Sequence, residues 1–195
     1  ISLLAAGTQW FGKSNFNINI LDVLGEWTDK KKNLLDNNIN YIKLGRLTIE
    51  LPISGFLKSR FISIVLFITN IFPLYSLLKR EKPDYLIIHL LTFIPLTLLI
   101  FFNFDTKFIL RISGLPRLNF FRKLLWKIIN KKITLVTCPS KATFEFIKKS
   151  RIFDENKIVM LHDPIINVSK ISTKKNVQNI DLKNLNKNYF LSIGR

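Results

Sequence analysis

A histidine and an arginine stand in two neighbouring apolar runs that predict buried strands. His89 ends the run Tyr85–His89, and Arg111 lies inside the run 107–112. A neutral imidazole can exchange a proton near neutral pH, and a buried guanidinium needs a polar partner. We therefore expect His89 to be either a catalytic residue or a hydrogen-bonded structural one. We expect Arg111 to contact either a phosphate or a carboxylate such as Asp84.

Small residues directly follow the second of these runs. Ser113 and Gly114 close it, and Arg117 comes shortly after. Ligands of parallel sheets bind where the strands end, so Arg111, Gly114 and Arg117 are candidates for a ligand-binding cleft. Gly114 could instead serve only to permit a turn with positive φ.

The elements that must position these residues alternate between strand and helix. Apolar, β-branched runs bounded by turn residues predict strands, and longer runs with helical spacing predict helices. The expected strands are 85–89, 107–112, 133–138 and 157–161, and the expected helices are 92–102, 120–130 and 141–149, with Ser140 as the N-cap of the last. This alternation predicts an α/β fold with a doubly wound parallel sheet.

The first part of the chain has weaker signals. Residues 40–45 alternate as a strand, and 18–25 fit either a strand or a helical turn. Residues 59–80 predict a long apolar helix that begins at Ser59 as N-cap and is kinked or split at Pro73.

Composition permits a large core and favours an anionic partner. The chain of 195 residues is 48% hydrophobic with 17 Phe, and its formal net charge is +17. Such a charge favours phosphorylated substrates, a membrane surface or nucleic acid, although AT-rich codon usage would also produce it.

The one cysteine, Cys138, excludes an internal disulfide and is expected to be a buried hydrophobe. The sequence contains no metal-ligand cluster, no Ser-His-Asp arrangement and no G-x-G-x-x-G, so no metal is expected.

Five segments in order resemble glycosyltransferase family 4, a group with the GT-B fold. The first is a Lys-Pro-Asp turn followed by an apolar strand and His (82–89), and the second is a strand with a small-residue loop (108–114). The others are a strand-Ser-helix segment (136–143), a Lys-Ile-Val strand ending in Asp-Pro (157–164) and a strand ending in Gly-Arg (189–195).

The resemblance implies two Rossmann-like domains that face each other across a cleft. The N-terminal domain would bind the acceptor, the C-terminal domain would bind a nucleotide-diphosphate sugar, and transfer would be retaining and metal-independent. Gly194 and Arg195 match the Gly-Arg pair whose arginine contacts the donor diphosphate, a task that suits a planar guanidinium. Many family members have a histidine where Ser113 stands, so Ser113 joins His89 as a candidate catalytic residue although serine is a poor acid or base at neutral pH.

The same resemblance predicts the domain organisation. Residues 1–168 would form the acceptor-side domain, with its first strand missing or altered, 169–186 a linker, and 187–195 the start of the donor-binding domain. Both ends of the chain look cut, so we expect a fragment that is inactive alone. The full-length protein would be cytoplasmic and would glycosylate a cell-envelope glycan or a lipid-linked acceptor.

A basic and aromatic stretch predicts contact with the inner face of the cytoplasmic membrane, where related enzymes reach lipid-linked acceptors. The candidate contacts are Arg122, Lys123, Trp126 and Lys127. Basic residues beside amphipathic aromatics suit an anionic lipid surface. The alternative is an ordinary helix whose apolar face, including Phe121, Leu124, Leu125, Ile128 and Ile129, packs in the core.

Two other functional classes compete with sugar transfer. The uncharged stretches 61–78 and 85–104 are each about long enough to span a bilayer, which would describe an integral membrane protein without catalytic function. A nucleic-acid-binding protein is disfavoured because the Lys residues are scattered and no recognised motif is present.

Overall fold

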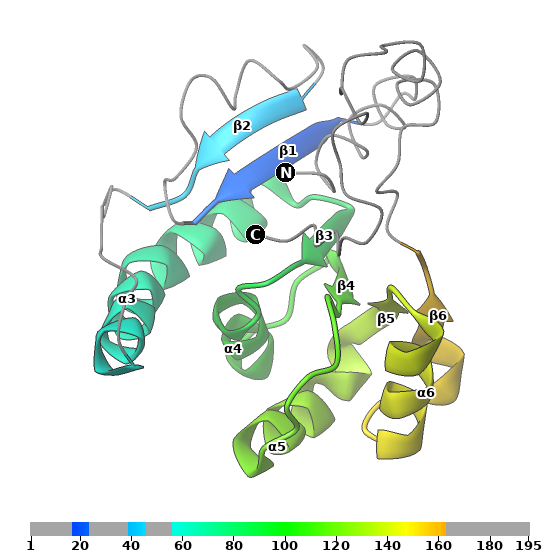
Figure 1. Cartoon of the computed structure of the whole chain (residues 1–195). Coiled ribbons are helices and arrows are strands. Elements are labelled where there is room, and N and C mark those ends of the chain that lie inside the picture. Colours follow the sequence, from blue (N-terminus) through cyan, green and yellow to red (C-terminus); the bar gives the residue numbers. More distant parts are fainter. Residues whose placement is uncertain (1–16, 24–38, 46–55, 163–195) are drawn as a thin grey trace, which may run out of the picture.

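The protein is an α/β structure built on parallel strands, as the sequence predicts (Figure 1). The computed structural model describes residues 17–23, 39–45 and 56–162, and the side chains of 56–60 are not described. The expected linker, the start of the donor-binding domain, and Gly194 and Arg195 therefore lie outside the described residues.

The larger sheet has four parallel strands in the order β3-β4-β5-β6. Every strand is rich in β-branched and apolar residues, which suit a sheet covered by helices. The strands are β3 (Tyr85–Ile88), β4 (Lys107–Arg111), β5 (Ile133–Cys138) and β6 (Ile158–Met160). All four expected strands are confirmed, and only their ends differ by a residue or two.

Helices connect consecutive strands of this sheet. They are α4 (Phe93–Phe101), α5 (Phe120–Ile129) and α6 (Lys141–Ser150), and short 3₁₀ helices η1 (Asn130–Lys132) and η2 (Glu155–Lys157) precede β5 and β6. Right-handed crossovers between sequential neighbours put all three helices on one face of the sheet, as Figure 1 shows. Ser140 caps α6 as expected, accepting a hydrogen bond from the Thr143 N–H at 3.2 Å. A doubly wound sheet has helices on both of its faces. The three described connecting helices cover only one face of the larger sheet, so this part of the prediction is not shown by the described residues.

The long helix α3 (Phe56–Glu81) packs beside α4. It begins before Ser59, so Ser59 is not its N-cap, and it is not split at Pro73. The helix continues because one face stays buried along its length, through Leu66, Leu74 and Leu78. Packing of this face compensates for the backbone hydrogen bond that Pro73 cannot donate.

A second, two-stranded parallel sheet lies near the carboxyl end of β3. It consists of β1 (Ile18–Asp22) and β2 (Ile39–Lys43), so the ambiguous segment 18–25 contains a strand. The Leu44 N–H donates to the Asp22 carbonyl at 3.0 Å, and this bond extends the pairing past the ends of both strands.

The core lies between the larger sheet and its helices. Side chains with at most a few per cent exposure alternate along the strands and meet the inner faces of the helices; they include Leu78, Ile88, Leu96, Phe108, Leu110, Ile129, Val136 and Ile147. Cys138 is fully buried among them, and burial raises the pKa of its thiol to about 11. Cys138 is therefore a buried hydrophobe, as expected, and its thiol stays protonated at neutral pH.

Candidate functional site

His89 and Arg111 lie side by side where the first two strands of the larger sheet end. Ile88 pairs with Leu110 in the parallel register; His89 directly follows β3, and Arg111 is the last residue of β4. Arg111 is 6% exposed. Burial first, and the nearby Arg111 charge second, lower the pKa of His89 below its ordinary value. The imidazole is therefore neutral at pH 7 and can act as a proton acceptor.

The backbone after His89 makes a tight, strained turn. Leu90 has a φ of 59°, and across it the Leu91 N–H donates to the His89 carbonyl at 2.8 Å. A three-residue turn with positive φ at a leucine is rare and costs energy, and such strain concentrates at functional sites. This turn ends β3 abruptly and leaves the Leu90 side chain exposed at the sheet edge.

A cavity of about 250 Å³ opens beside Arg111 at this edge. Arg111, Ser113 and Gly114 line it, together with Arg122 and Trp126 from α5. The structure thus brings three of the expected site residues into one cavity.

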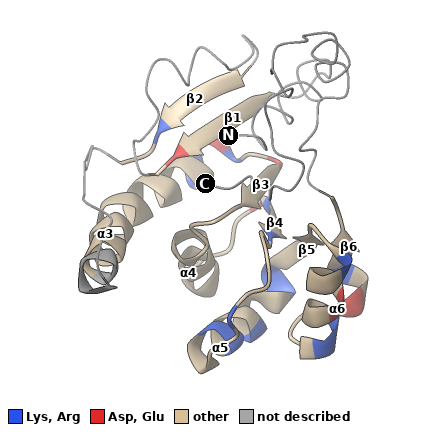
Figure 2. Cartoon of the chain, in the orientation of Figure 1, with Lys and Arg blue, Asp and Glu red and all other residues tan. Residues whose placement is uncertain are grey.

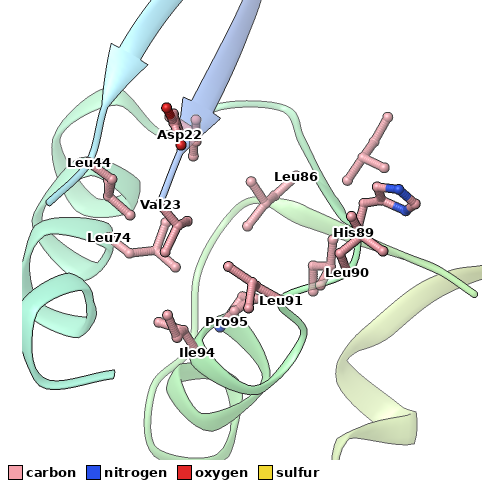
Figure 3. A pocket seen from close by; sticks show the side chains of 13 residues that line it. Asp22, Val23, Leu44, Leu74, Leu86, His89, Leu90, Leu91, Ile94 and Pro95 are labelled. Carbon is pink, nitrogen blue, oxygen red and sulfur yellow. The ribbon is translucent and has the colours of Figure 1, made fainter. Parts of the chain in front are cut away.

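A second cavity, of about 230 Å³, shares the lining residue Leu90 with the first and is shown in Figure 3. Its lining is largely apolar, and it includes the end of β1, with Asp22, and His89 across from Leu44 and Leu74. The Tyr41 hydroxyl donates to Asp22 at 2.6 Å. Burial and this carboxylate raise the pKa of Tyr41 to about 12. The hydroxyl therefore stays protonated and keeps its hydrogen bond to the Asp22 carboxylate at the cavity rim.

Two expectations remain, the position of Arg117 and the conformation of Gly114. Arg117 is exposed and does not line either cavity, but its carbonyl accepts a 2.9 Å hydrogen bond from Nη1 of Arg122. Gly114 has no positive φ, and a Cβ added to it would meet no atom within 4 Å, so the expectation that it serves a strained turn is wrong. The sequence pattern predicted Arg122 only as a membrane contact, and nothing in it indicated that Arg122 lines the cavity.

The surface of α5 also differs from both sequence-based expectations. Arg122, Lys123 and Lys127 are exposed. Figure 2 shows Lys and Arg positions in blue along α5. Trp126, in contrast, is 4% exposed and packs on Phe153 with ring centroids 5.4 Å apart. Trp126 therefore belongs to the core and is not a membrane contact.

Most of the apolar α5 residues expected in the core lie at the surface instead. Phe121, Leu124 and Ile128 are exposed, and of the predicted apolar face only Ile129 is buried, with Leu125 half-buried. Relative to the predicted orientation, the helix is turned about its own axis, so that Trp126 and Ile129 are its buried residues.

Within the described residues, no group of three or more His, Cys, Asp and Glu side chains is placed to hold a metal ion. The polar groups that line the two cavities at this edge are an imidazole, two guanidinium groups, hydroxyls and the Asp22 carboxylate.

Comparisons with known proteins found no relative. No protein-family model matches the sequence, and neither the curated proteins nor the solved structures contain a significant match. The resemblance to glycosyltransferase family 4 therefore rests on the sequence segments alone.

We predict that His89 makes stability depend on pH. Because folding lowers the pKa of this group, the unfolded chain binds the proton more readily, and the free energy of unfolding should fall as the pH drops below about 6.5. Urea unfolding between pH 5 and pH 8 should show that His89→Gln removes part of this fall. Exposed His162 provides the matched control, His162→Gln, and equal pH curves for wild type and His89→Gln would refute the prediction.

Proposed function

We propose that this chain forms the acceptor-binding part of a glycosyltransferase. The reaction would move a sugar from a nucleotide-diphosphate sugar to a cell-envelope glycan or a lipid-linked acceptor, with retention and without a metal. The observation that supports this best is the Arg111 cavity beside His89 at the carboxyl ends of parallel strands. In parallel α/β sheets this edge is where substrates bind.

The residues at this edge suit an acceptor hydroxyl. A neutral His89 can accept a hydrogen bond from a sugar hydroxyl, and the guanidinium groups favour negative charge that develops during transfer. Leu90, Leu115 and Pro116 add apolar surface to the cavity, on which the face of a sugar ring could pack. Gly194 and Arg195 would bind the donor diphosphate, as their resemblance implies.

Sugar transfer is tested best with protein expressed from the complete gene. We expect it to bind uridine, guanosine or adenosine diphosphate in calorimetric titrations and to release that diphosphate from a matching nucleotide sugar. Arg195→Ala should weaken the binding about tenfold, since a charged bidentate contact to phosphate is lost. Arg80→Ala, at an exposed arginine on α3, is the control. If none of the nucleotides binds the intact protein, the proposal fails.

The surface of α5 supports peripheral attachment to the cytoplasmic face of an anionic membrane. Phe120 and Phe121 are 73% and 78% exposed at its first turn, with Leu124 and Ile128 further along. The segment 106–144 contains no Asp or Glu; its Lys and Arg residues are Lys107, Arg111, Arg117, Arg122, Lys123, Lys127, Lys131, Lys132 and Lys141. Exposed aromatics among cations without acidic neighbours favour an anionic lipid surface.

Vesicle co-sedimentation tests this attachment. We expect binding to vesicles with about 30 mol% phosphatidylserine, whose negative surface potential attracts basic segments, and weak binding to pure phosphatidylcholine. The double change Phe120→Ala and Phe121→Ala should lower the bound fraction several-fold. Phe101→Ala is the matched control, because Phe101 is 72% exposed but ends α4, near Lys132 beyond the last turn of α5 rather than at the first turn of α5. Equal losses for both variants would contradict a specific role of α5.

An integral membrane protein is the second candidate, and α3 is the observation that favours it. Residues 61–81 form a helix long and apolar enough to cross a membrane, and 22% of its apolar stretch is buried. Phe61, Ile64, Ile68 and Phe72 are exposed along one side. The other apolar stretch, 85–104, is divided into β3 and α4. Alkaline carbonate should release the protein from membranes if α5 holds it peripherally, and retention would favour insertion of α3.

A further inference from the structure

The cavity beside Arg111 combines two guanidinium groups with hydroxyl groups, and no acidic side chain of the described residues lines it. Arg111 ends β4 and Arg122 lies in the first turn of α5, so the loop between these elements brings two cations to one hollow. Thr92 and Ser113 are the hydroxyl-bearing residues of its lining. Within the part of the chain that the structure describes, the other lining residues are apolar or glycine, and none is Asp or Glu.

The two arginines are held in different ways. Arg111 is 6% exposed, so its charge acts through a low-dielectric interior and its field is weakly screened. Arg122 is at the surface, but Nη1 donates to the Arg117 carbonyl at 2.9 Å and its backbone N–H donates to the Asn119 Oδ1 at 2.9 Å. These bonds fix the start of α5 and orient the Arg122 side chain along the loop that forms the cavity wall.

We propose that this cavity binds a phosphate group of the acceptor. Guanidinium forks and hydroxyl donors match the tetrahedral oxygens of a phosphate monoester or diphosphate, and cationic sites without carboxylates favour anions. A volume of about 250 Å³ also leaves room beside the phosphate for part of a sugar ring or a second phosphate. That the phosphate belongs to an acceptor rests on the proposed function, whereas the phosphate site itself does not.

Such a phosphate can come from a soluble sugar phosphate or from a lipid-linked one. The apolar residues Leu115 and Pro116 line the same cavity, and exposed Phe120 follows on α5. An isoprenoid or acyl chain attached to the phosphate could therefore lie along an apolar surface as it leaves the cavity.

Titration of the full chain tests the site, with the change in tryptophan fluorescence as the signal, because Trp126, one of three tryptophans, lines the cavity. The probes are inorganic pyrophosphate, glucose 1-phosphate and monomeric dihexanoyl phosphatidic acid. Arg122→Ala should weaken binding of at least one probe about tenfold, as expected for the loss of a charge-assisted contact. Tighter binding of glucose 1-phosphate would identify a soluble source, and tighter binding of the phosphatidic acid a lipid one.

The control is Lys123→Ala, which removes the same charge from the neighbouring position of α5 but does not line the cavity. Equal weakening by both variants would show diffuse charge attraction and overturn the proposal, as would binding that Arg122→Ala leaves unchanged. Arg111→Lys, checked for folding by circular dichroism, should also weaken binding because an ammonium cannot form the bidentate contact. Phosphate binding that depends on Arg122 in a protein that binds no nucleoside diphosphate would refute sugar transfer and leave this site standing.

Discussion

Phe108→Ala should lower the free energy of unfolding by about 3–5 kcal/mol, the largest effect we expect for a single substitution. Phe108 lies on β4 in the middle of the larger sheet and is 2% exposed. Its ring packs against Phe104 at a centroid distance of 5.9 Å and against the aliphatic core under the helices. Removing the ring loses this burial and leaves a cavity that the surrounding strands can fill only partly.

The matched control is the same chemical change at an exposed position. Phe121→Ala on α5 should change the free energy of unfolding by no more than about 0.5 kcal/mol, because Phe121 is 78% exposed. Both variants can be compared by urea unfolding followed by circular dichroism. Similar losses at the two positions would mean that α5 packs its phenylalanines into the core, contrary to the structure.

Gly45→Ala should destabilise the protein by about 1–3 kcal/mol, the second largest effect we expect. A Cβ on Gly45, which follows β2, would lie 2.8 Å from Oδ1 of Asn70 on α3. Asn70 is buried, and its Nδ2 donates to the Leu66 carbonyl at 2.9 Å, so its side chain cannot move away without losing that bond. Thermal unfolding of the purified variant measures the effect.

A double-mutant cycle identifies the cause of this loss. If the clash with Asn70 is responsible, Gly45→Ala combined with Asn70→Ala should cost less than the sum of the two single changes. Gly114→Ala is the control, because no atom lies within 4 Å of the added Cβ, and it should leave stability nearly unchanged. If the effects of the two changes on the free energy of unfolding are strictly additive, the clash with Asn70 is not the cause of the loss at Gly45.

The two proposals about binding meet at the start of α5. Arg122 lines the cavity, and Phe120 and Phe121 beside it are exposed among cations. A protein attached to an anionic membrane by these phenylalanines would hold the mouth of the cavity close to the lipid head groups. Loss of vesicle binding and loss of phosphate binding can still be separated, because different residues are changed in the two experiments.

The sequence by itself determined the order and type of the elements from residue 85 onward. Runs such as 133–138 are short, apolar and bounded by turn residues, and Ser140 precedes a helical pattern, so local preferences agree with the final fold. Burial of Cys138 was also predictable, since a small apolar residue ends a strand that must be covered. Local signals failed for α3, where burial of one face along the helix outweighs the effect of Pro73.

Only the tertiary structure decided which residues meet at the candidate site. The neighbouring position of His89 and Arg111 depends on the pairing of β3 with β4, and these strands are connected through α4, so no hairpin turn sets their register. The rotation that buries Trp126 and leaves Phe121 exposed depends on the shape of the space beneath the sheet, because both residues are apolar enough for either place. Sequence patterns report how strongly a side chain avoids water, whereas competition for a limited core volume decides which of several apolar side chains is buried.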